Sequence, residues 1–246
     1  KISFSNIKEK QYIWTYFSVK SILLIQKLSA LEIWERAIKI VLSMNNRIVI
    51  IPTYNEIENI EAIIHKVMSL EPSFDLLIVD DGSPDGTALK VKELQVQYGE
   101  RLHLQERKGK LGLGTAYIHG FKYALARGFE YIFEMDADFS HNPNDLEKLL
   151  EACKNGADVA IGSRYSNGVN VVNWPLSRVL LSYFASVYVR MITGMKIADA
   201  TAGFKCYRKI VLEKINLDRI KFVGYAFQIE MKYRAFVNKF NIVEVP

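Results

Sequence analysis

The stretch FDLLIVDDGSPDGT, residues 74–87, joins an apolar run to an acidic, glycine-containing turn and then to a helical segment. Its branched apolar side chains predict a strand over residues 74–80, and Ser83–Pro84 supplies a cap and a first-turn proline for a helix over residues 84–97. Strands that are apolar at nearly every position are typical of a sheet buried on both faces. This stretch therefore predicts an α/β fold.

The same unit recurs on both sides of this stretch. Further strands are predicted at residues 47–52, 101–107, 131–136 and 157–163, and further helices at residues 56–69, 112–127 and 143–154. This alternation predicts a mostly parallel central sheet flanked by helices. Beyond residue 165 the alternation breaks, and we expect helices near 176–193 and 226–238 and a last strand at 241–245.

Polar loops follow the predicted strands. In open α/β sheets, ligands bind outside the carboxyl ends of the strands, so these loops are the candidate site. They read PTYNE, DDGSPDGT, RKGKLGLGT, DADFSH and GSRY.

Asp136 and Asp138 lie two residues apart in the loop DADFSH. If they continue the preceding strand, they point the same way and repel each other unless a cation lies between them. Paired carboxylates suit Mg²⁺ or Mn²⁺, which takes one or two of them together with substrate phosphates. The alternative, a pair of capping aspartates without a metal, stays open at this point.

Three other loops contain candidate ligand-binding residues. Asp81 can accept hydrogen bonds from a ribose or a base, whereas its glycine and aspartate neighbours are explained by turn formation. Arg164 follows a strand, and Arg178 and Ser182 share one face of a predicted helix, so the two arginines are candidates for phosphate binding. Lys110 faces either a phosphate or solvent.

Composition excludes several classes of protein. The net charge of +5 arises mainly in residues 1–43, which hold seven Lys/Arg and three Glu, so the remaining 25 basic and 24 acidic residues nearly balance and no nucleic-acid partner is predicted. Cys153 and Cys206 are far apart in the sequence, which indicates neither a disulfide framework nor a zinc site. The dinucleotide fingerprint GxGxxG fails at Tyr117, which disfavours a Rossmann oxidoreductase.

The first methionine, Met44, stands just before the first strong strand. We therefore expect residues 1–43 to be an N-terminal extension that is not native, the alternative being an amphipathic segment that touches a membrane or packs on the domain. No apolar run in this segment reaches the length of a spanning helix.

Seven ordered motifs resemble those of the family 2 glycosyltransferases, and most of all the dolichol-phosphate (polyprenol-phosphate) mannose synthases. The resemblance covers residues 47–246 and rests on VIIPTYNE, VDDGSPDGT, LGLGTAYIHGF, MDADFSH, IGSRY, NWPLSR and TAGFKCYR. It implies a nucleotide-sugar-binding domain of the glycosyltransferase A type over residues 44–246. It also implies mannose transfer from GDP-mannose to a polyprenyl (dolichyl) phosphate, with Mg²⁺ or Mn²⁺, by a protein bound peripherally at the cytosolic face of a membrane.

The resemblance also implies residue roles. Positions that hold the donor nucleotide match Pro52, Tyr54, Glu56, Asp81, Asp136 and Ala137, and the metal site matches Asp136 and Asp138. Positions near the lipid phosphate and the transferred sugar match Arg164, Arg178 and Ser182. Weaker matches place the acidic residues Asp199 and Glu230 beside the site.

The acceptor is itself an ionised phosphate, so no strong general base is expected, and a single in-line displacement predicts a β-mannosyl product. The helix from Leu176 is the candidate membrane contact, unless its apolar face is core.

One departure from the family concerns the C-terminus. Family members continue past VEVP into a loop with further basic residues, so we expect the sequence to be truncated at Pro246, with donor binding kept and transfer weakened. The alternatives are a UDP-glucose-dependent polyprenyl-phosphate glucosyltransferase, another family 2 enzyme, or a nucleotide-sugar-binding fragment without transfer.

Overall fold

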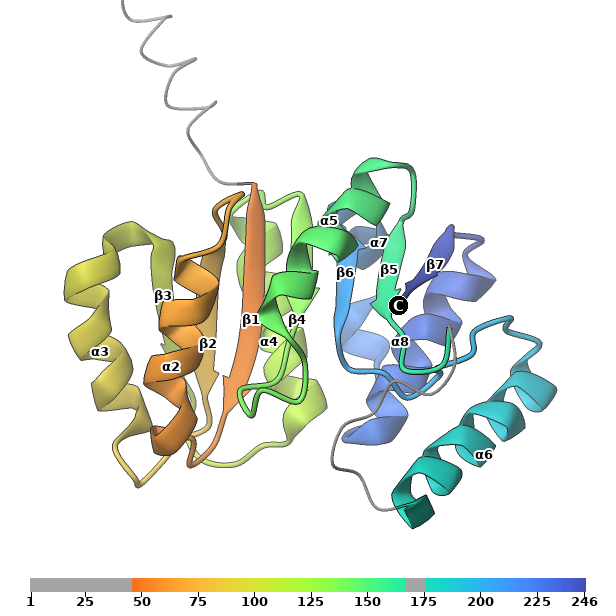
Figure 1. Ribbon diagram of the computed structural model, residues 1–246, viewed down its shortest axis with the longest axis horizontal. Helices are drawn as coiled ribbons and strands as arrows, with labels where there is room; N and C mark the ends of the chain where they lie inside the picture. Colours follow the sequence, from red (N-terminus) through yellow and green to blue (C-terminus); the bar gives the residue numbers. More distant parts are fainter. Residues whose placement is uncertain (1–45, 167–175) are drawn as a thin grey trace, which may run out of the picture. The chain divides into compact units, whose positions relative to one another are not determined.

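A computed structural model describes residues 46–166 and 176–246. Its seven strands form one sheet in the order β3-β2-β1-β4-β6-β5-β7 (Figure 1). The elements in chain order are β1 Arg47–Thr53, α2 Ile57–Met68, β2 Asp75–Asp80, α3 Thr87–Tyr98, β3 Leu102–Glu106, α4 Leu113–Ala126, β4 Tyr131–Glu134, α5 Leu146–Lys154, β5 Val159–Gly162, α6 Leu176–Thr193, β6 Lys205–Arg208, α7 Lys209–Lys214, α8 Tyr225–Val237 and β7 Ile242–Val245. The predicted boundary at residue 43 lies outside the described residues and stays a prediction.

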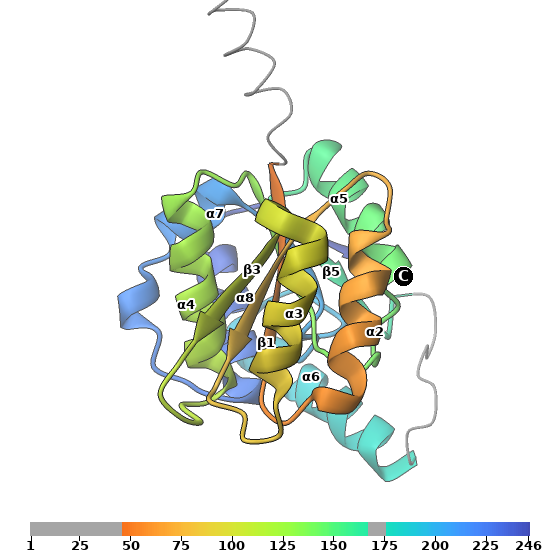
Figure 2. The same cartoon turned by 90° about the vertical axis from the view of Figure 1, so that its left-hand side faces the viewer.

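The sheet is buried on both faces, as the apolar strands predict. Along β1, Ile48 and Ile50 pack against one cluster and Val49 and Ile51 against the other, and all four are fully buried. Figure 2 shows α4 and α7 on one side of the sheet and α2 and α5 on the other. Most of the apolar surface of these helices is therefore buried against the sheet.

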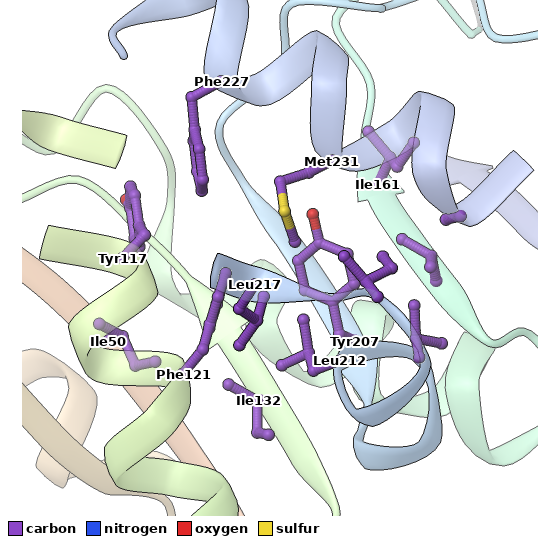
Figure 3. Packing of buried hydrophobic residues seen from close by; sticks show 14 of the residues in the cluster. Ile50, Tyr117, Phe121, Ile132, Ile161, Tyr207, Leu212, Leu217, Phe227 and Met231 are labelled. Atoms are coloured by element: carbon purple, nitrogen blue, oxygen red, sulfur yellow. The ribbon is translucent and has the colours of Figure 1, made fainter. Parts of the chain in front are cut away.

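The cluster beneath α4, α7 and α8 is rich in aromatic side chains (Figure 3). Tyr117 of α4 and Phe227 of α8 stack with ring centroids 6.0 Å apart and planes 2° apart. Gly120 lets α4 approach the sheet, because a Cβ on it would lie 2.6 Å from Cγ2 of Ile50. This packing fixes α4 and α8 beside the loops that end β1 and β4.

The first four strands pair in parallel, as predicted, but the sheet is not parallel throughout. β6 runs antiparallel to both β4 and β5. The sequence analysis assigned neither β6 nor α7, because KCYR is only four residues long and its lysine interrupts the apolar pattern. The predicted start of α3 at Pro84 is also wrong: the helix begins at Thr87, after Gly86 with φ +92°.

Candidate active site

The candidate site lies along one edge of the sheet. Because β1, β2, β3 and β4 are parallel, their carboxyl ends meet at this edge, which is the lower one in Figure 1. The loops that follow them contain most of the residues predicted to bind ligands. α6 also lies along this edge of the molecule in both ribbon views (Figures 1 and 2).

The loops after β1 and β2 are joined by hydrogen bonds from backbone N–H groups of the first to side chains of the second. The N–H of Asn55 donates to Oγ of Ser83 at 3.0 Å, and the N–H of Ile57 donates to a carboxylate oxygen of Asp85 at 3.1 Å. These bonds place the predicted nucleoside residues Tyr54 and Glu56 beside the β2 loop, whereas the third, Pro52, lies within β1 opposite Val79. Ser83 and Asp85 thus link two loops rather than start a helix.

Asp81 is buried at the end of β2, and both its carboxylate oxygens have protein partners. Nε of Arg107 donates to Oδ1 at 2.6 Å, and the N–H of Leu111 donates to Oδ2 at 3.1 Å. Arg107 also donates to Oγ1 of Thr115 at 2.9 Å, so it connects Asp81 to the start of α4. The sequence analysis did not single out Arg107, which it placed at the end of the predicted strand 101–107, whereas β3 ends one residue earlier, at Glu106.

Lys110 extends from the same loop toward the predicted nucleoside residues. Its ammonium lies 4.4 Å from the ring centroid of Tyr54, within the range of a cation–π contact. The structure thus brings the phosphate-binding candidate Lys110 into contact with Tyr54, a predicted nucleoside residue 56 positions away in the sequence.

The two aspartates of DADFSH do not continue a strand. β4 ends at Glu134, and a positive φ of 55° at Phe139 turns the chain just after Asp138. The argument that both side chains share one face of a strand is therefore wrong. Asp136 is half-buried and Asp138 is exposed, with Ala137 buried between them.

Tyr117 positions the first aspartate. Its hydroxyl donates to Oδ1 of Asp136 at 3.0 Å, and its ring is fully buried. Burial, with a further contribution from the negative charge of Asp136, raises the pKa of Tyr117 well above its usual value, so the phenol stays protonated as a donor. Sequence reasoning used Tyr117 only to exclude a dinucleotide fingerprint and missed this contact.

The aspartate pair fits a divalent cation that is completed by a substrate. No cluster of three or more His, Cys, Asp or Glu side chains that could hold a metal occurs among residues 46–166 and 176–246. Asp138 is exposed at this edge, and its Oδ1 accepts the N–H of Ser140 at 3.0 Å. Two carboxylates at an open edge match Mg²⁺, which usually keeps several waters and takes substrate phosphates as its remaining ligands.

Arg164, Asp199, Thr201 and Ser182 form a second cluster. Arg164 donates to both carboxylate oxygens of Asp199, each at 2.7 Å, and to Oγ1 of Thr201 at 2.9 Å. Oγ of Ser182 lies 3.3 Å from the same threonine oxygen. The structure therefore brings together three predicted site residues and adds Thr201.

Asp199 is an ionised partner for this arginine. Burial alone would raise the pKa of Asp199, but the hydrogen bonds and charge of Arg164 outweigh it and hold the pKa below its usual value. From β7, Glu244 accepts the N–H groups of Ala198 and Asp199 at 2.7 and 2.9 Å. Asp199 thus holds the guanidinium of Arg164, and Glu244 in turn holds the backbone at Asp199.

Two other predicted residues have different outcomes. Arg178 lies in the first turns of α6, and its side chain lies outside the described residues. The carboxylate of Glu230 accepts the N–H groups of Lys221 and Phe222 and pairs with Arg234 at 2.6 Å. These contacts give Glu230 a role in holding the loop before α8, and none of them is with another predicted site residue.

A buried polar network lies beneath the aspartates. Lys205 of β6 contacts Glu134 at the end of β4 and Gln228 of α8, and all three side chains are buried. Nε2 of Gln228 also donates to Oε2 of Glu134 at 2.9 Å. The network thus connects β4, β6 and α8, and its member Glu134 stands two residues before Asp136 in the sequence.

Comparisons with known proteins identify the family of this chain. The family described as Glycosyl transferase family 2 matches residues 48–216. The chain is 49% identical over 199 residues to a polyprenol monophosphomannose synthase of Mycolicibacterium smegmatis, covering 81% of this chain and 75% of that protein. It is 44% identical over 197 residues to an undecaprenyl-phosphate mannosyltransferase of Micrococcus luteus, covering 80% of each.

Solved structures share the fold. A glucosyl-3-phosphoglycerate synthase of Mycobacterium tuberculosis with Mg²⁺ and UDP superposes with a TM-score of 0.58 at 19% identity, over 80% of this chain and 68% of that one. The same enzyme with Mn²⁺, UDP and phosphoglyceric acid gives a TM-score of 0.55 at 20% identity, over 80% and 67%. These likenesses confirm the predicted glycosyltransferase A type fold. With a family match over most of its described residues and relatives of such high identity, the chain belongs to glycosyltransferase family 2.

Proposed function

We propose that this protein transfers mannose from GDP-mannose to a polyprenyl (dolichyl) phosphate. The identity of 49% to a polyprenol monophosphomannose synthase is the observation that carries the proposal. The site geometry supports it, because the segment from Asp199 to Gly203 contacts both kinds of group. Its start holds Arg164, which suits a phosphate, and its end lies beside Asp136, which suits a cation-bound diphosphate. A reaction between a nucleotide sugar and a lipid phosphate needs both kinds of site.

The donor half uses the loops after β1, β2 and β4. Pro52, Tyr54, Glu56 and Asp81 hold the nucleoside, and Asp136 and Ala137 lie near the diphosphate. Asp136 and Asp138 are the residues that would hold Mg²⁺ or Mn²⁺, which when bound neutralises the diphosphate charge that grows as GDP leaves. Tyr117 keeps Asp136 in place through its hydroxyl.

The acceptor half centres on Arg164, which is held by Asp199. Ser182 of α6 lies close to it through Thr201, and Arg178 is one turn before Ser182 on the same helix. An ionised oxygen of the lipid phosphate attacks the anomeric carbon, a carbon–oxygen bond forms there, and the bond to the GDP oxygen breaks. The electron pair leaves with GDP, and no proton has to be removed from the nucleophile. One displacement inverts the anomeric centre, so an α-linked donor gives a β-mannosyl phospholipid.

We also propose that α6 contacts the membrane that holds the acceptor, at its cytosolic face. No helix in the described part of the chain combines the length and hydropathy needed to cross a bilayer. α6 instead exposes large apolar side chains, of which Leu181, Phe184, Tyr188, Met191 and Ile192 are 62–80% exposed. Among the α6 side chains that the structure describes, only Ser186 and Val189 are buried, and the exposed apolar side chains are available to contact lipid.

The test offers labelled GDP-mannose or UDP-glucose with a short polyprenyl phosphate and Mg²⁺ or Mn²⁺, and follows label into the organic phase. We expect metal-dependent transfer from GDP-mannose only, and its loss in Asp138→Asn. The matched control is Asp218→Asn, which removes a carboxylate that is 78% exposed on another surface. Transfer from UDP-glucose alone, or a product with α linkage, would contradict the proposal.

A further inference from the structure

The segment Asp199–Gly203 connects the two halves of the site. At its start, Asp199 and Thr201 hold the guanidinium of Arg164. At its end, the backbone of Gly203 lies against the other half, because a Cβ on this residue would lie 3.6 Å from Oδ2 of Asp136. The conformation of this segment therefore sets where Arg164 lies relative to the aspartates.

A buried lysine of α8 holds the middle of this segment. Nζ of Lys232 donates to the carbonyl oxygens of Ala200 and Ala202 at 2.9 and 2.7 Å, and its side chain has no exposed surface. The two carbonyl groups flank Thr201, so Nζ of Lys232 binds the backbone on both sides of the residue that contacts Arg164. Lys205 makes longer contacts to the carbonyls of Ala202 and Gly203, at 3.4 and 3.5 Å.

Lys232 is a costly residue to bury. Among the ion pairs of the described residues, none joins Lys232 to a carboxylate, and removing an ammonium from water costs several kcal/mol. Burial, with a further contribution from the charge of Lys205, lowers the pKa of Lys232 well below its usual value.

We propose that Lys232 is a positioning residue for the acceptor half of the site: by binding the carbonyls of Ala200 and Ala202 it fixes Thr201 and Asp199, and through them the Arg164 guanidinium that receives the acceptor phosphate. The proposal rests on the function proposed above. It assigns no contact between Lys232 and either substrate.

The test compares Lys232→Met with Lys154→Met, a control that removes an exposed lysine at the end of α5. Binding of a short polyprenyl phosphate in detergent micelles, without donor, reports on the acceptor half. Binding of GDP with Mn²⁺ reports on the donor half. We expect Lys232→Met to weaken acceptor binding by about tenfold, as the loss of two buried hydrogen bonds implies, and to leave GDP binding unchanged.

Two results would overturn the inference: acceptor binding equal to that of Lys154→Met, or acceptor and GDP binding that fall together with the melting temperature. If Lys232→Met does not fold, Thr201→Val takes its place, because it keeps the lysine and removes the hydrogen bond to Arg164; unchanged acceptor binding in this variant would also overturn the inference. A wild-type protein that binds the lipid phosphate but transfers no mannose would contradict the proposed function and leave this inference standing.

Discussion

The ammonium of Lys205 lies 2.8 Å from a carboxylate oxygen of Glu134, and neither side chain has any exposed surface. Burial lowers the pKa of Lys205, and the charge and hydrogen bond of Glu134 act against that decrease. The pair joins β6, the antiparallel strand, to the last residue of β4. It therefore fixes the end of β4 from which the chain continues to Asp136.

Removing one partner of this pair should be more damaging than removing both. We expect Glu134→Gln to lower the free energy of unfolding by about 3–5 kcal/mol, because it leaves the Lys205 ammonium buried without an opposite charge. The double variant with Lys205→Met should recover part of that loss. Urea unfolding of the wild type, both single variants and the double variant measures the coupling, and strictly additive losses would contradict it.

The substitution Arg164→Lys should retain the positive charge but strongly reduce mannose transfer to the lipid phosphate. A lysine cannot donate in parallel to both oxygens of Asp199 and also reach Thr201, so the phosphate-binding group shifts. We expect kcat/KM for the lipid phosphate to fall on the order of 10²-fold, as for a misplaced reactant, with GDP binding unchanged. Arg208→Lys is the control, since Arg208 is a half-exposed arginine that pairs with Glu130 and Asp158 at 3.4–3.5 Å.

Tyr117→Phe tests the hydrogen bond to Asp136. Phenylalanine fills the same volume between Phe121 and Phe227, and only the donor to the carboxylate is lost. We expect the Mn²⁺ concentration for half-maximal transfer to rise by roughly tenfold or more, as is usual when a residue that orients a metal ligand is removed. An unchanged Mn²⁺ requirement would show that Asp136 does not depend on this hydroxyl.

The sequence predicts the first half of the fold well because its strands are apolar throughout and its loops are polar. The predicted strands at residues 47–52 and 74–80 agree with β1 and β2 to within one residue at each end, and the long helix over residues 176–193 agrees with α6. The same pattern places Asp81, Asp136 and Asp138 in loops at one edge. The positions of these strands, helices and loops can be predicted because they depend on the local pattern of apolar and polar residues.

The contacts that complete the site depend on tertiary structure, which cannot be predicted from the local sequence pattern. The partners of Asp81, Asp136 and Arg164 are Arg107, Tyr117 and Asp199, which lie 19 to 35 residues away in the sequence. The strand β6 was not predicted for the same reason. Lys205 is a charged residue, and it can be buried in the core only because it pairs with Glu134. The resemblance supplied Asp199, and only the structure supplied its bond to Arg164.

Polar substitutions on α6 should release the protein from membranes without unfolding it. Leu181 and Phe184 are 73% and 62% exposed, so Leu181→Ser/Phe184→Ser removes little buried apolar area. We expect this double variant to lose flotation with vesicles that contain anionic lipid. The control is Leu89→Ser/Val96→Ser on α3, where the two side chains are 65% and 90% exposed, and equal flotation of both variants would contradict the role of α6.

The buried lysine of α8 should make stability depend on alkaline pH. The groups that face Lys232 are the cations Lys205 and Arg164 and the carboxylates Asp199 and Glu134. Folding lowers the pKa of Lys232, so the unfolded chain, with a lysine pKa of about 10.4, binds its proton more tightly. Between the lowered pKa and about 10.4, unfolding takes up a proton, and the folded state therefore gains stability as the pH rises.

The comparison of wild type with Lys232→Met isolates this effect, because the other titrating groups are common to both proteins. We expect the free energy of unfolding of the wild type, relative to the variant, to increase by up to about 1.4 kcal/mol per pH unit within that window. Urea unfolding at pH 7.5, 8.5 and 9.5 measures it, and this range stays below the titration of Tyr117 and Tyr207, whose pKa values burial raises well above the usual one. A difference between the two proteins that stays constant from pH 7.5 to 9.5 would mean that Lys232 does not change its protonation on folding in this range, and that its ammonium is retained at full charge in the core.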